Sequence, residues 1–225
     1  MSRHLYRGLQ EQPMVGAGGI AADPLTIKVC GHDLRIHRLF HLSKIEPAFI
    51  DGQVYVIRLP THTQVGMGQG GGGQEQRIEC VATVAQPGYS SWDTDDKKKY
   101  LDDALDAISP ASRQWLEESV NPIIGEGKSM IPHGVKASYY LQGIATAASS
   151  QGKGLATAIL RHLVERARRD GALMGLNTIS EDAHRLYERC GFRTIHKAPI
   201  VYAGESGQGF SYVMVNDCLG EAQNE

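Results

Sequence analysis

The sequence predicts a single α/β domain. Two observations indicate this class: short segments that alternate apolar and polar residues are interspersed with longer segments of helical spacing, and no shift in composition divides the chain. The 225 residues are enough to bury one full core. We therefore assign residues 23–219 to a single domain and residues 1–22, which hold few apolar side chains, to a mobile lead-in.

The first third of the chain is predicted to contain a strand, a helix and a hairpin. Residues 25–29 alternate as a half-buried strand would, and the loosely helical segment after them is expected to end at Pro47. Two further strands, at residues 54–59 and 77–85, predict the hairpin. Its tip carries six glycines within positions 66–73 but lacks the Lys and Ser or Thr of a P-loop, so we interpret it as a flexible loop.

Residues 86–137 are predicted to be mainly helical. Apolar side chains recur there at spacings of three and four in two stretches, around Leu105 and around Leu116, which Ser109 and Pro110 separate. The charged cluster before the first stretch is typical of the solvated start of a helix. We therefore expect two helices in this segment.

A strand, a glycine turn and an amphipathic helix follow one another in the second half. The strand covers residues 138–146, and the helix begins at Leu155 and ends before Gly171, which can adopt a left-handed cap. Gly152 and Gly154 leave the N–H groups of the first helical turn accessible, and such groups bind anions with the help of the helix dipole. The same glycines could instead serve only to make a tight turn.

Two motifs in this half carry a family resemblance. The run Gln151-Gly152-Lys153-Gly154-Leu155-Ala156 matches the Q/R-x-x-G-x-G/A signature of the GNAT acyltransferase superfamily. Further along, Asn177, Ala183, Leu186, Tyr187 and Cys190-Gly191-Phe192 resemble the second motif of that family, N…A-x-x-L-Y-x-x-x-G-F. The chain therefore resembles an N-acetyltransferase well over residues 138–215, and over residues 24–137 only in the order of its strands and helices.

The resemblance implies how acetyl-CoA would bind. Two neighbouring strands of the mixed, splayed sheet, here residues 138–146 and 172–177, would separate and admit the cofactor. Its pantetheine arm would pair with the backbone of one strand, and its pyrophosphate would rest on the glycine turn. The expected cofactor-binding residues are Ile144, Ala145, Thr146, Gln151, Gly152, Lys153, Gly154, Leu155, Ala156, Thr157, Asn177, Ala183 and Tyr187.

Tyr187 is the residue that we expect to take part in the chemistry. Its helix, predicted over residues 180–190, places Ala183 and Cys190 on the same face, so periodicity alone predicts that Tyr187 packs in the core. The resemblance implies another role, because a tyrosine at this place protonates the departing CoA thiolate as a general acid. In water this proton transfer is uphill by roughly 1.5 pKa units, or about 2 kcal/mol, and desolvation of the thiolate would narrow the gap.

The general base is less well defined by the residues. Several members of the family carry a Glu on the strand equivalent to residues 138–146, at the position that holds Tyr140 here. Glu79 on the preceding strand, or His133 in the loop before residue 138, could accept the proton of the amine through water. The backbone N–H of Ile144 could polarise the thioester carbonyl.

The expected reaction is transfer of an acetyl group to a primary amine by direct attack in a ternary complex. A formal charge of -2 and the absence of long charged tracks favour a small-molecule amine or an amino acid, and neither nucleic acid nor a membrane is an expected partner. Residues 86–137 would form the acceptor side, with Tyr139, Tyr140 and Trp92 as its walls. Core packing is the competing explanation for these aromatic residues.

Alternatives from other classes stay open. The fold could hold an acyl-CoA without turning it over, or the acceptor could be a peptide or a protein. A βαβ dinucleotide site would need a third glycine at position 157 and an acidic residue at position 177, where the sequence has Thr157 and Asn177.

The composition also allows predictions about the cellular compartment and about metal binding. Four cysteines form no CxxC pair and no apolar run resembles a signal peptide or a membrane span, so we expect a cytoplasmic protein, with the nucleus left open. No metal is expected, because His37 and His41, at helical spacing, lack a third ligand. A homodimer is left open.

Overall fold

The computed structural model describes residues 24–60, 76–201 and 208–217, so the predicted lead-in and the glycine-rich loop lie outside the described residues. In the described part, one mixed sheet has the strand order β1-β2-β3-β4-β6-β5, and only β3 and β4 pair in parallel. The strands are β1 (Gln53–Pro60), β2 (Gln76–Ala85), β3 (Tyr139–Thr146), β4 (Met174–Thr178), β5 (Arg193–Val201) and β6 (Gln208–Asn216). The predicted mixed α/β fold and its hairpin are confirmed.

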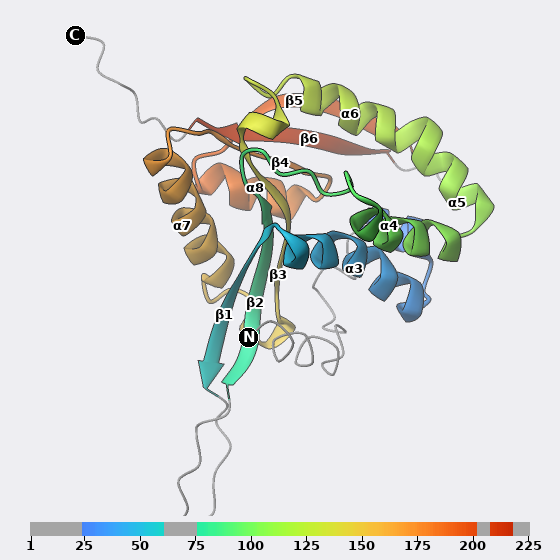
Figure 1. The fold of residues 1–225 in the computed structure, drawn as a ribbon, viewed down its shortest axis with the longest axis horizontal. Helices are drawn as coiled ribbons and strands as arrows, with labels where there is room; N and C mark the ends of the chain where they lie inside the picture. Colours follow the sequence, from blue (N-terminus) through green and yellow to red (C-terminus); the bar gives the residue numbers. More distant parts are fainter. Residues whose placement is uncertain (1–23, 61–75, 202–207, 218–225) are drawn as a thin grey trace, which may run out of the picture.

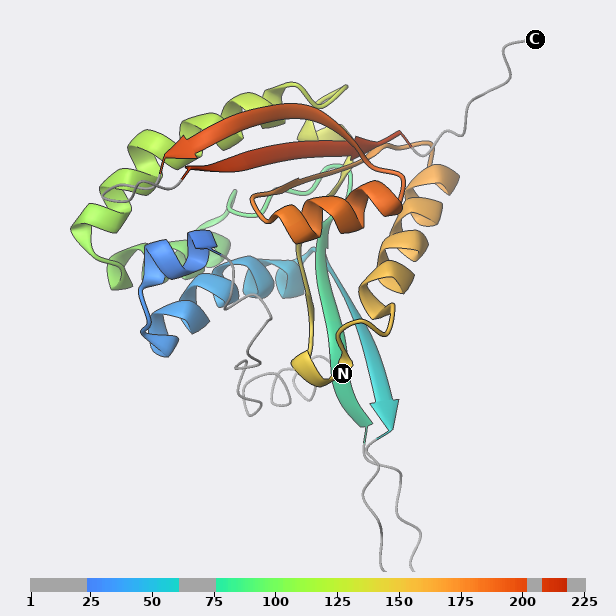
Figure 2. The same ribbon diagram turned by 180° about the vertical axis from the view of Figure 1, so that it is seen from behind.

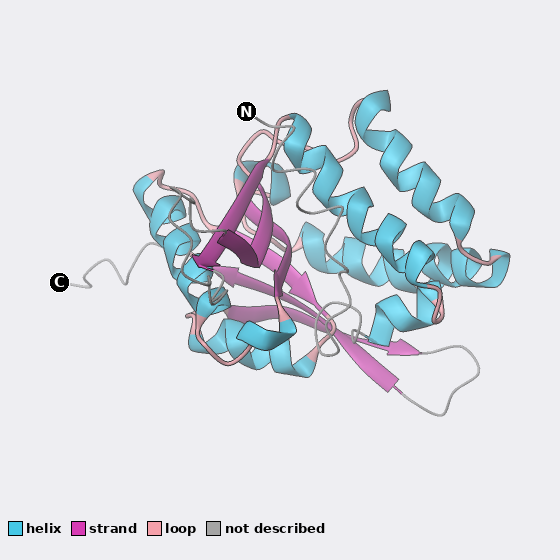
Figure 3. Cartoon of the chain, turned by 90° about the horizontal axis from the view of Figure 1, so that it is seen from below, coloured by secondary structure: helices cyan, strands magenta, loops and turns pink. Residues whose placement is uncertain are grey.

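Helices cover both faces of this sheet, which is the middle layer in Figure 3. Two of them, α7 (Leu155–Arg169) and α8 (Glu181–Arg189), lie together over one face (Figure 2). The other face carries α2 (Pro24–Cys30), α3 (Leu34–Ile50), α4 (Asp95–Ala107), α5 (Pro110–Trp115) and α6 (Asn121–Ser129) (Figure 1). A turn of π-helix, Leu116–Val120, joins α5 to α6, so the second predicted helix extends further than expected, to Ser129.

The main core lies between the sheet and the pair α7 and α8. The buried face of α7 consists of Ile159, Leu160, Leu163 and Ala167, the row that its sequence periodicity predicts. These side chains meet the inward residues of β2, β3, β4 and β6, among them Met174 and Leu176, which are fully buried. The core therefore anchors the turn before α7 and the start of α8 at the same end of β3 and β4.

The predicted strand over residues 25–29 is wrong, because residues 24–30 form helix α2. Thr26, Val29 and Cys30 are almost fully buried and lie at the helical spacings i, i+3 and i+4. Val29 and Cys30 pack in a cluster that includes Trp115 of α5. A segment this short is compatible both with the two-residue period of a strand and with the 3.6-residue period of a helix. Packing against the helical layer decides in favour of the helix.

Pro47 does not end α3, contrary to the prediction, and the helix continues to Ile50. Proline lacks the N–H that would bond to the carbonyl of Ser43, four residues earlier. The indole Nε1 of Trp92 donates to that carbonyl instead, at 3.2 Å. Because a partner outside the helix satisfies the carbonyl, α3 tolerates proline in its last turn.

Ion pairs of the buried Lys97 with two half-exposed carboxylates hold the segment after β2 against α3. Lys97 is 1% exposed, and its Nζ lies 2.9 Å from Asp51 Oδ2 and 2.5 Å from Asp93 Oδ1. It also donates to the carbonyl of Ser90 at 2.8 Å. The chain over residues 90–97 is thereby tied to the end of α3.

Helix α6 approaches the sheet closely at Gly127. A Cβ at this position would lie 2.5 Å from Val213 Cγ2 and 2.7 Å from His196 Nδ1. Gly127→Ala should therefore lower the free energy of unfolding by roughly 1–3 kcal/mol through overpacking, measured by urea titration. Gly125 of the same helix has open space around it, so Gly125→Ala should leave stability unchanged or raise it. Equal effects of the two substitutions would contradict this account of the packing.

Candidate active site

The sheet divides between β3 and β4. Their parallel pairing covers Tyr139 to Leu141 and ends at the pair Leu141 and Leu176. Beyond this pair β3 continues to Thr146 against β2 alone, and β4 continues to Thr178 against β6 alone. The predicted separation of the two strands is thus confirmed, and we call this opening the fork.

A β-bulge at Gln142 accounts for the fork. Thr83 pairs with Gly143 and Val84 pairs with Leu141, so Gln142 is an extra residue in β3. A bulge bends its strand and strengthens the local twist, here immediately after the last pair with β4. The Gln142 side chain donates to Ser91 Oγ, and its buried Oε1 has no hydrogen-bond partner among the described residues. Periodicity did not reveal this residue, because a bulge has no signature in the pattern of apolar residues.

Backbone groups of β3 face the fork at alternate residues. The N–H of Ala147 donates to the carbonyl of Glu79 at 2.8 Å, which makes them a hydrogen-bonded pair of the antiparallel ladder. Counting back from this pair, Thr146 and Ile144 direct their N–H and C=O groups away from β2. Gln151 Nε2 approaches the Thr146 carbonyl at 3.4 Å from that side. These edges could pair with an extended ligand, as the sequence predicted.

The glycine turn opens toward solvent at the end of β3. Gly152 and Gly154 have φ values of 74° and 78°, and a Cβ on either would meet nothing within 4 Å. Gly154 is the N-cap of α7, and no side chain caps the helix there. The N–H groups of the first turn, from Leu155 onward, are therefore available to an anion. Lys153 lies in the same turn, with its Nζ 3.3 Å from Ser150 Oγ.

Tyr187 projects from α8 into the core behind the fork. Its ring packs edge-on against Phe192, with centroids 5.8 Å apart. Burial raises the pKa of its hydroxyl, and the nearby Cys190 thiol adds to this effect. The hydroxyl therefore stays protonated through neutral and alkaline pH, the state that a proton donor needs. Because the phenol is desolvated too, desolvation of the thiolate alone does not close the pKa gap between the two groups.

Tyr140 and Asn177 link the fork to the helical layer. Tyr140 precedes the last β3–β4 pair, and its hydroxyl donates to Asn177 Oδ1 at 2.9 Å. Burial raises the pKa of Tyr140, and Tyr187 raises it further, so the two phenols interact electrostatically. Asn177 is the first residue of β4 beyond the pairing with β3. Its amide is thus held in place at the mouth of the fork.

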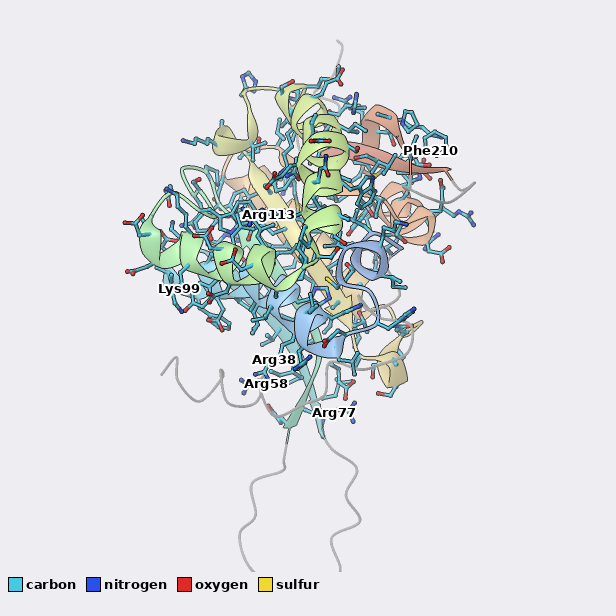
Figure 4. The ribbon with its side chains drawn as sticks, turned by 90° about the vertical axis from the view of Figure 1, so that its right-hand side faces the viewer. Arg38, Arg58, Arg77, Lys99, Arg113 and Phe210 are labelled. Carbon is cyan, nitrogen blue, oxygen red and sulfur yellow. The ribbon has the colours of Figure 1, made fainter. Side chains whose placement is uncertain are left out.

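The structure does not place either predicted base beside Tyr187. Glu79 lies next to Ala147, and its Oε1 is 3.2 Å from the Nε of Arg77, a residue near the end of the hairpin (Figure 4). Its other oxygen is buried without a hydrogen-bond partner among the described residues. His133 is exposed, has a φ of 63°, and precedes β3, at the opposite end of the strand from the fork.

The predicted acceptor walls do not share one surface. Successive residues of a strand point to opposite faces, and Tyr139 packs with α7, where its hydroxyl donates to Asp170 Oδ2 at 2.5 Å. Tyr140 faces α6. Trp92 is 37% exposed and donates to α3. Of the three aromatic residues, Tyr140 is the one at the fork on the side of the helical layer.

The remaining residues of the second motif support α8. Ser180 caps the helix by accepting from the N–H of Ala183 at 3.3 Å. Ala183 and Cys190 are partly buried against the main core. Burial raises the pKa of the Cys190 thiol, and the hydroxyl of Thr157 on α7 lowers it. This contact joins the two helices that flank the fork.

Comparison with known proteins now identifies the class. The model of the acetyltransferase (GNAT) family matches residues 79–192, just over half of the chain and the part that forms the fork, the glycine turn and Tyr187. The chain belongs to the acetyltransferase (GNAT) family. It is an acyltransferase by class, and acetyl-CoA is the cofactor that this family uses.

Several solved structures are similar in fold. The ribosomal-protein-S18-alanine N-acetyltransferase of Escherichia coli is 15% identical, with 87% of this chain and 84% of that chain covered and a TM-score of 0.42. The histone acetyltransferase HPA2 and related acetyltransferase from Corynebacterium glutamicum is 20% identical, with 88% and 83% covered and a TM-score of 0.48. A structure of yncA from Salmonella typhimurium with its cofactor acetyl-CoA is 16% identical, with 66% and 63% covered and a TM-score of 0.36. No curated protein sequence matches the chain closely enough to count as a relative.

The described residues contain neither a cluster of metal ligands nor a membrane-spanning helix. No three side chains of His, Cys, Asp or Glu come together there as a metal site. His37 Nε2 instead lies 2.7 Å from the carbonyl of Gly31. None of the described helices is both long and apolar enough to cross a bilayer.

The other histidine of that pair, His41, should make the protein sensitive to acid. Burial, together with the charges of Lys44 and His37, lowers the pKa of His41 to about 3. The unfolded chain takes up this proton near pH 6.5 and the folded protein near pH 3, so stability falls as the pH drops through that window. From pH 7 to pH 5 the loss is about 2 kcal/mol.

His41→Gln should remove most of this difference when the free energy of unfolding is compared at the two pH values. His32 is exposed, so His32→Gln should leave the difference intact. An unchanged pH dependence in the His41 variant would show that other groups cause the acid sensitivity.

Proposed function

We propose that the protein transfers the acetyl group of acetyl-CoA to a primary amine of a small molecule or an amino acid. The observation that carries this proposal is the arrangement at one end of β3, where unpaired strand edges and an uncapped helix N-terminus flank one fork, with Tyr187 in the core behind it. Acetyl-CoA fits these features: its polar arm can pair with the strand edges, its pyrophosphate can bind the helix N-terminus, and its thioester would lie near Tyr187.

Different residues of this chain would bind different parts of acetyl-CoA. The backbone of Ile144 and Thr146 would hold the pantetheine arm, and the N–H groups after Gly154 would hold the pyrophosphate. Asn177, fixed by Tyr140, would orient groups at the mouth of the fork. Acetyl-CoA supplies an activated acetyl group.

The chemistry at the fork needs one bond formed, one broken and one proton returned. The amine nitrogen bonds to the acetyl carbon while the carbon–sulfur bond breaks, and the hydroxyl of Tyr187 donates its proton to the sulfur. The proton lost by the amine passes through water and restores the phenol.

Surface charge supports a small acceptor over a charged polymer. Lys99 and Arg113 lie on the outer side of the helical layer (Figure 4). Each forms an ion pair within its own helical segment, Lys99 with Asp103 and Arg113 with Glu117. Cations neutralised in this way create little field to attract a polyanion or an acidic tail.

A second candidate function is an acyl-CoA-binding module without turnover. The observation in its favour is that neither Glu79 nor His133 lies beside Tyr187. The two candidates differ in whether an amine releases thiol from bound acetyl-CoA.

The test combines binding with turnover. Acetyl-CoA at about 100 times its Kd should stabilise the fold by roughly 2.7 kcal/mol, visible as a rise in melting temperature. Free CoA thiol should then appear on addition of small amines or amino acids. Stabilisation without thiol release from any amine or peptide would favour the binding module, thiol release from peptides alone would favour the peptide or protein acceptor, and no stabilisation would refute the site.

A further inference from the structure

Lys128 lies over the ring of Tyr140 without a countercharge among the described residues. It is in the last turn of α6, and its Nζ sits 5.1 Å from the centroid of the Tyr140 ring. Tyr140 in turn donates to Asn177 at the mouth of the fork. One side chain therefore separates this ammonium group from the residues around the fork, on the side of the helical layer.

No carboxylate among the described residues neutralises this ammonium group. Burial lowers the pKa of Lys128, and the one charged residue that adds to the shift is Lys44, another cation. Glu126 is two residues away, but it is exposed and its Oε1 lies 4.0 Å from His196 Nε2. A partly buried ammonium group in such surroundings is costly unless an anion joins it.

The packing of α6 keeps Lys128 at this place. The close approach of Gly127 to Val213 and His196 fixes the last turn of the helix against the sheet. Lys128 is partly buried, so part of its side chain remains exposed to solvent. A site of this kind combines a fixed positive charge with an aromatic wall.

We infer that the acceptor carries a carboxylate, which binds the ammonium group of Lys128 and leaves the amine of the acceptor facing the fork. This inference rests on the proposed function and names its substrate class as amino acids or other amines that bear a carboxylate. The charge of Lys128 repels a polyamine, whose additional ammonium groups would lie in the same space.

Acceptors matched in shape but not in charge test the inference. For several side chains, the amino acid, its amide and its decarboxylated amine are compared by kcat/KM at saturating acetyl-CoA, with spermidine as the polyamine. The amino acid should exceed its amide about 10- to 100-fold, the range expected of one charged hydrogen bond. Lys128→Met, which keeps the aliphatic stem, should abolish this preference through KM, while Lys128→Arg retains part of it.

The control is Lys99→Met, which removes a lysine on the outside of α4 and should leave the preference intact. The inference fails if wild-type protein uses amide and acid equally, if spermidine is the best acceptor, or if Lys128→Met slows all acceptors to the same extent. If no amine releases thiol, the proposed function fails by itself. Calorimetric titration of the CoA complex with the amino acid and its amide then still tests whether Lys128 selects the carboxylate.

Discussion

Tyr187→Phe should lower kcat about 10²- to 10⁴-fold, the range typical of a lost general acid, while the Kd for acetyl-CoA stays within a factor of a few. The substitution removes the hydroxyl and keeps the ring that packs on Phe192. Stability should therefore change little, and the loss should fall on the chemical step. Turnover is measured by thiol release at saturating substrates.

A matched control comes from the same core. Tyr212 is also buried against α8, where its hydroxyl donates to Glu181. Tyr212→Phe removes a hydroxyl of the same kind and should cost stability without a comparable loss of kcat. If Tyr187→Phe turns over at the wild-type rate, Tyr187 is a core residue and the general acid lies elsewhere.

Gly154→Val should raise the Kd for acetyl-CoA about 10- to 100-fold or more, since hydrogen bonds to a charged group contribute roughly 1.5–3 kcal/mol each. Gly154 has a φ of 78°, a conformation that a β-branched residue adopts only with strain. The new side chain would also stand in the open space above the turn, where the pyrophosphate must approach the backbone. Binding is measured by calorimetry with acetyl-CoA.

Gly171→Val is the control that separates backbone strain from the loss of cofactor contacts. It lies just beyond the other end of α7, with a φ of 65° and open space around it. Gly171→Val should destabilise the protein to a similar degree but leave the Kd for acetyl-CoA unchanged. Equal losses of affinity in both variants would mean that Gly154 serves only to make the turn. Substitutions within residues 66–73, outside the described residues, are likewise expected to leave binding intact.

The elements of the second half were predictable because each carries a strong local pattern. The helix after Gly154 has a continuous apolar row, and the turns at Gly171 and Gly191 need a positive φ that glycine adopts easily. The order of the motifs was enough to place the cofactor turn and Tyr187 on neighbouring elements. In contrast, the spacing of the apolar residues in α2 fits both a strand and a helix. Helix α3 passes through Pro47 because Trp92 donates to the carbonyl of Ser43, which lies 49 residues earlier in the chain.

The sequence by itself determined the glycine turn and the helix that carries Tyr187, because these depend on short-range periodicity and on residues spaced along one segment. Its two motifs indicated the family, and the mixed sheet followed from that resemblance. The tertiary structure alone decided which of the candidate acceptor residues meet. It separated Tyr139 from Tyr140 across the sheet, did not bring Glu79 or His133 beside Tyr187, and placed Gln142 at the fork and Lys128 against the ring of Tyr140. A bulge and a close helix–sheet contact arise from the pairing of distant segments, and neither leaves a pattern along the chain.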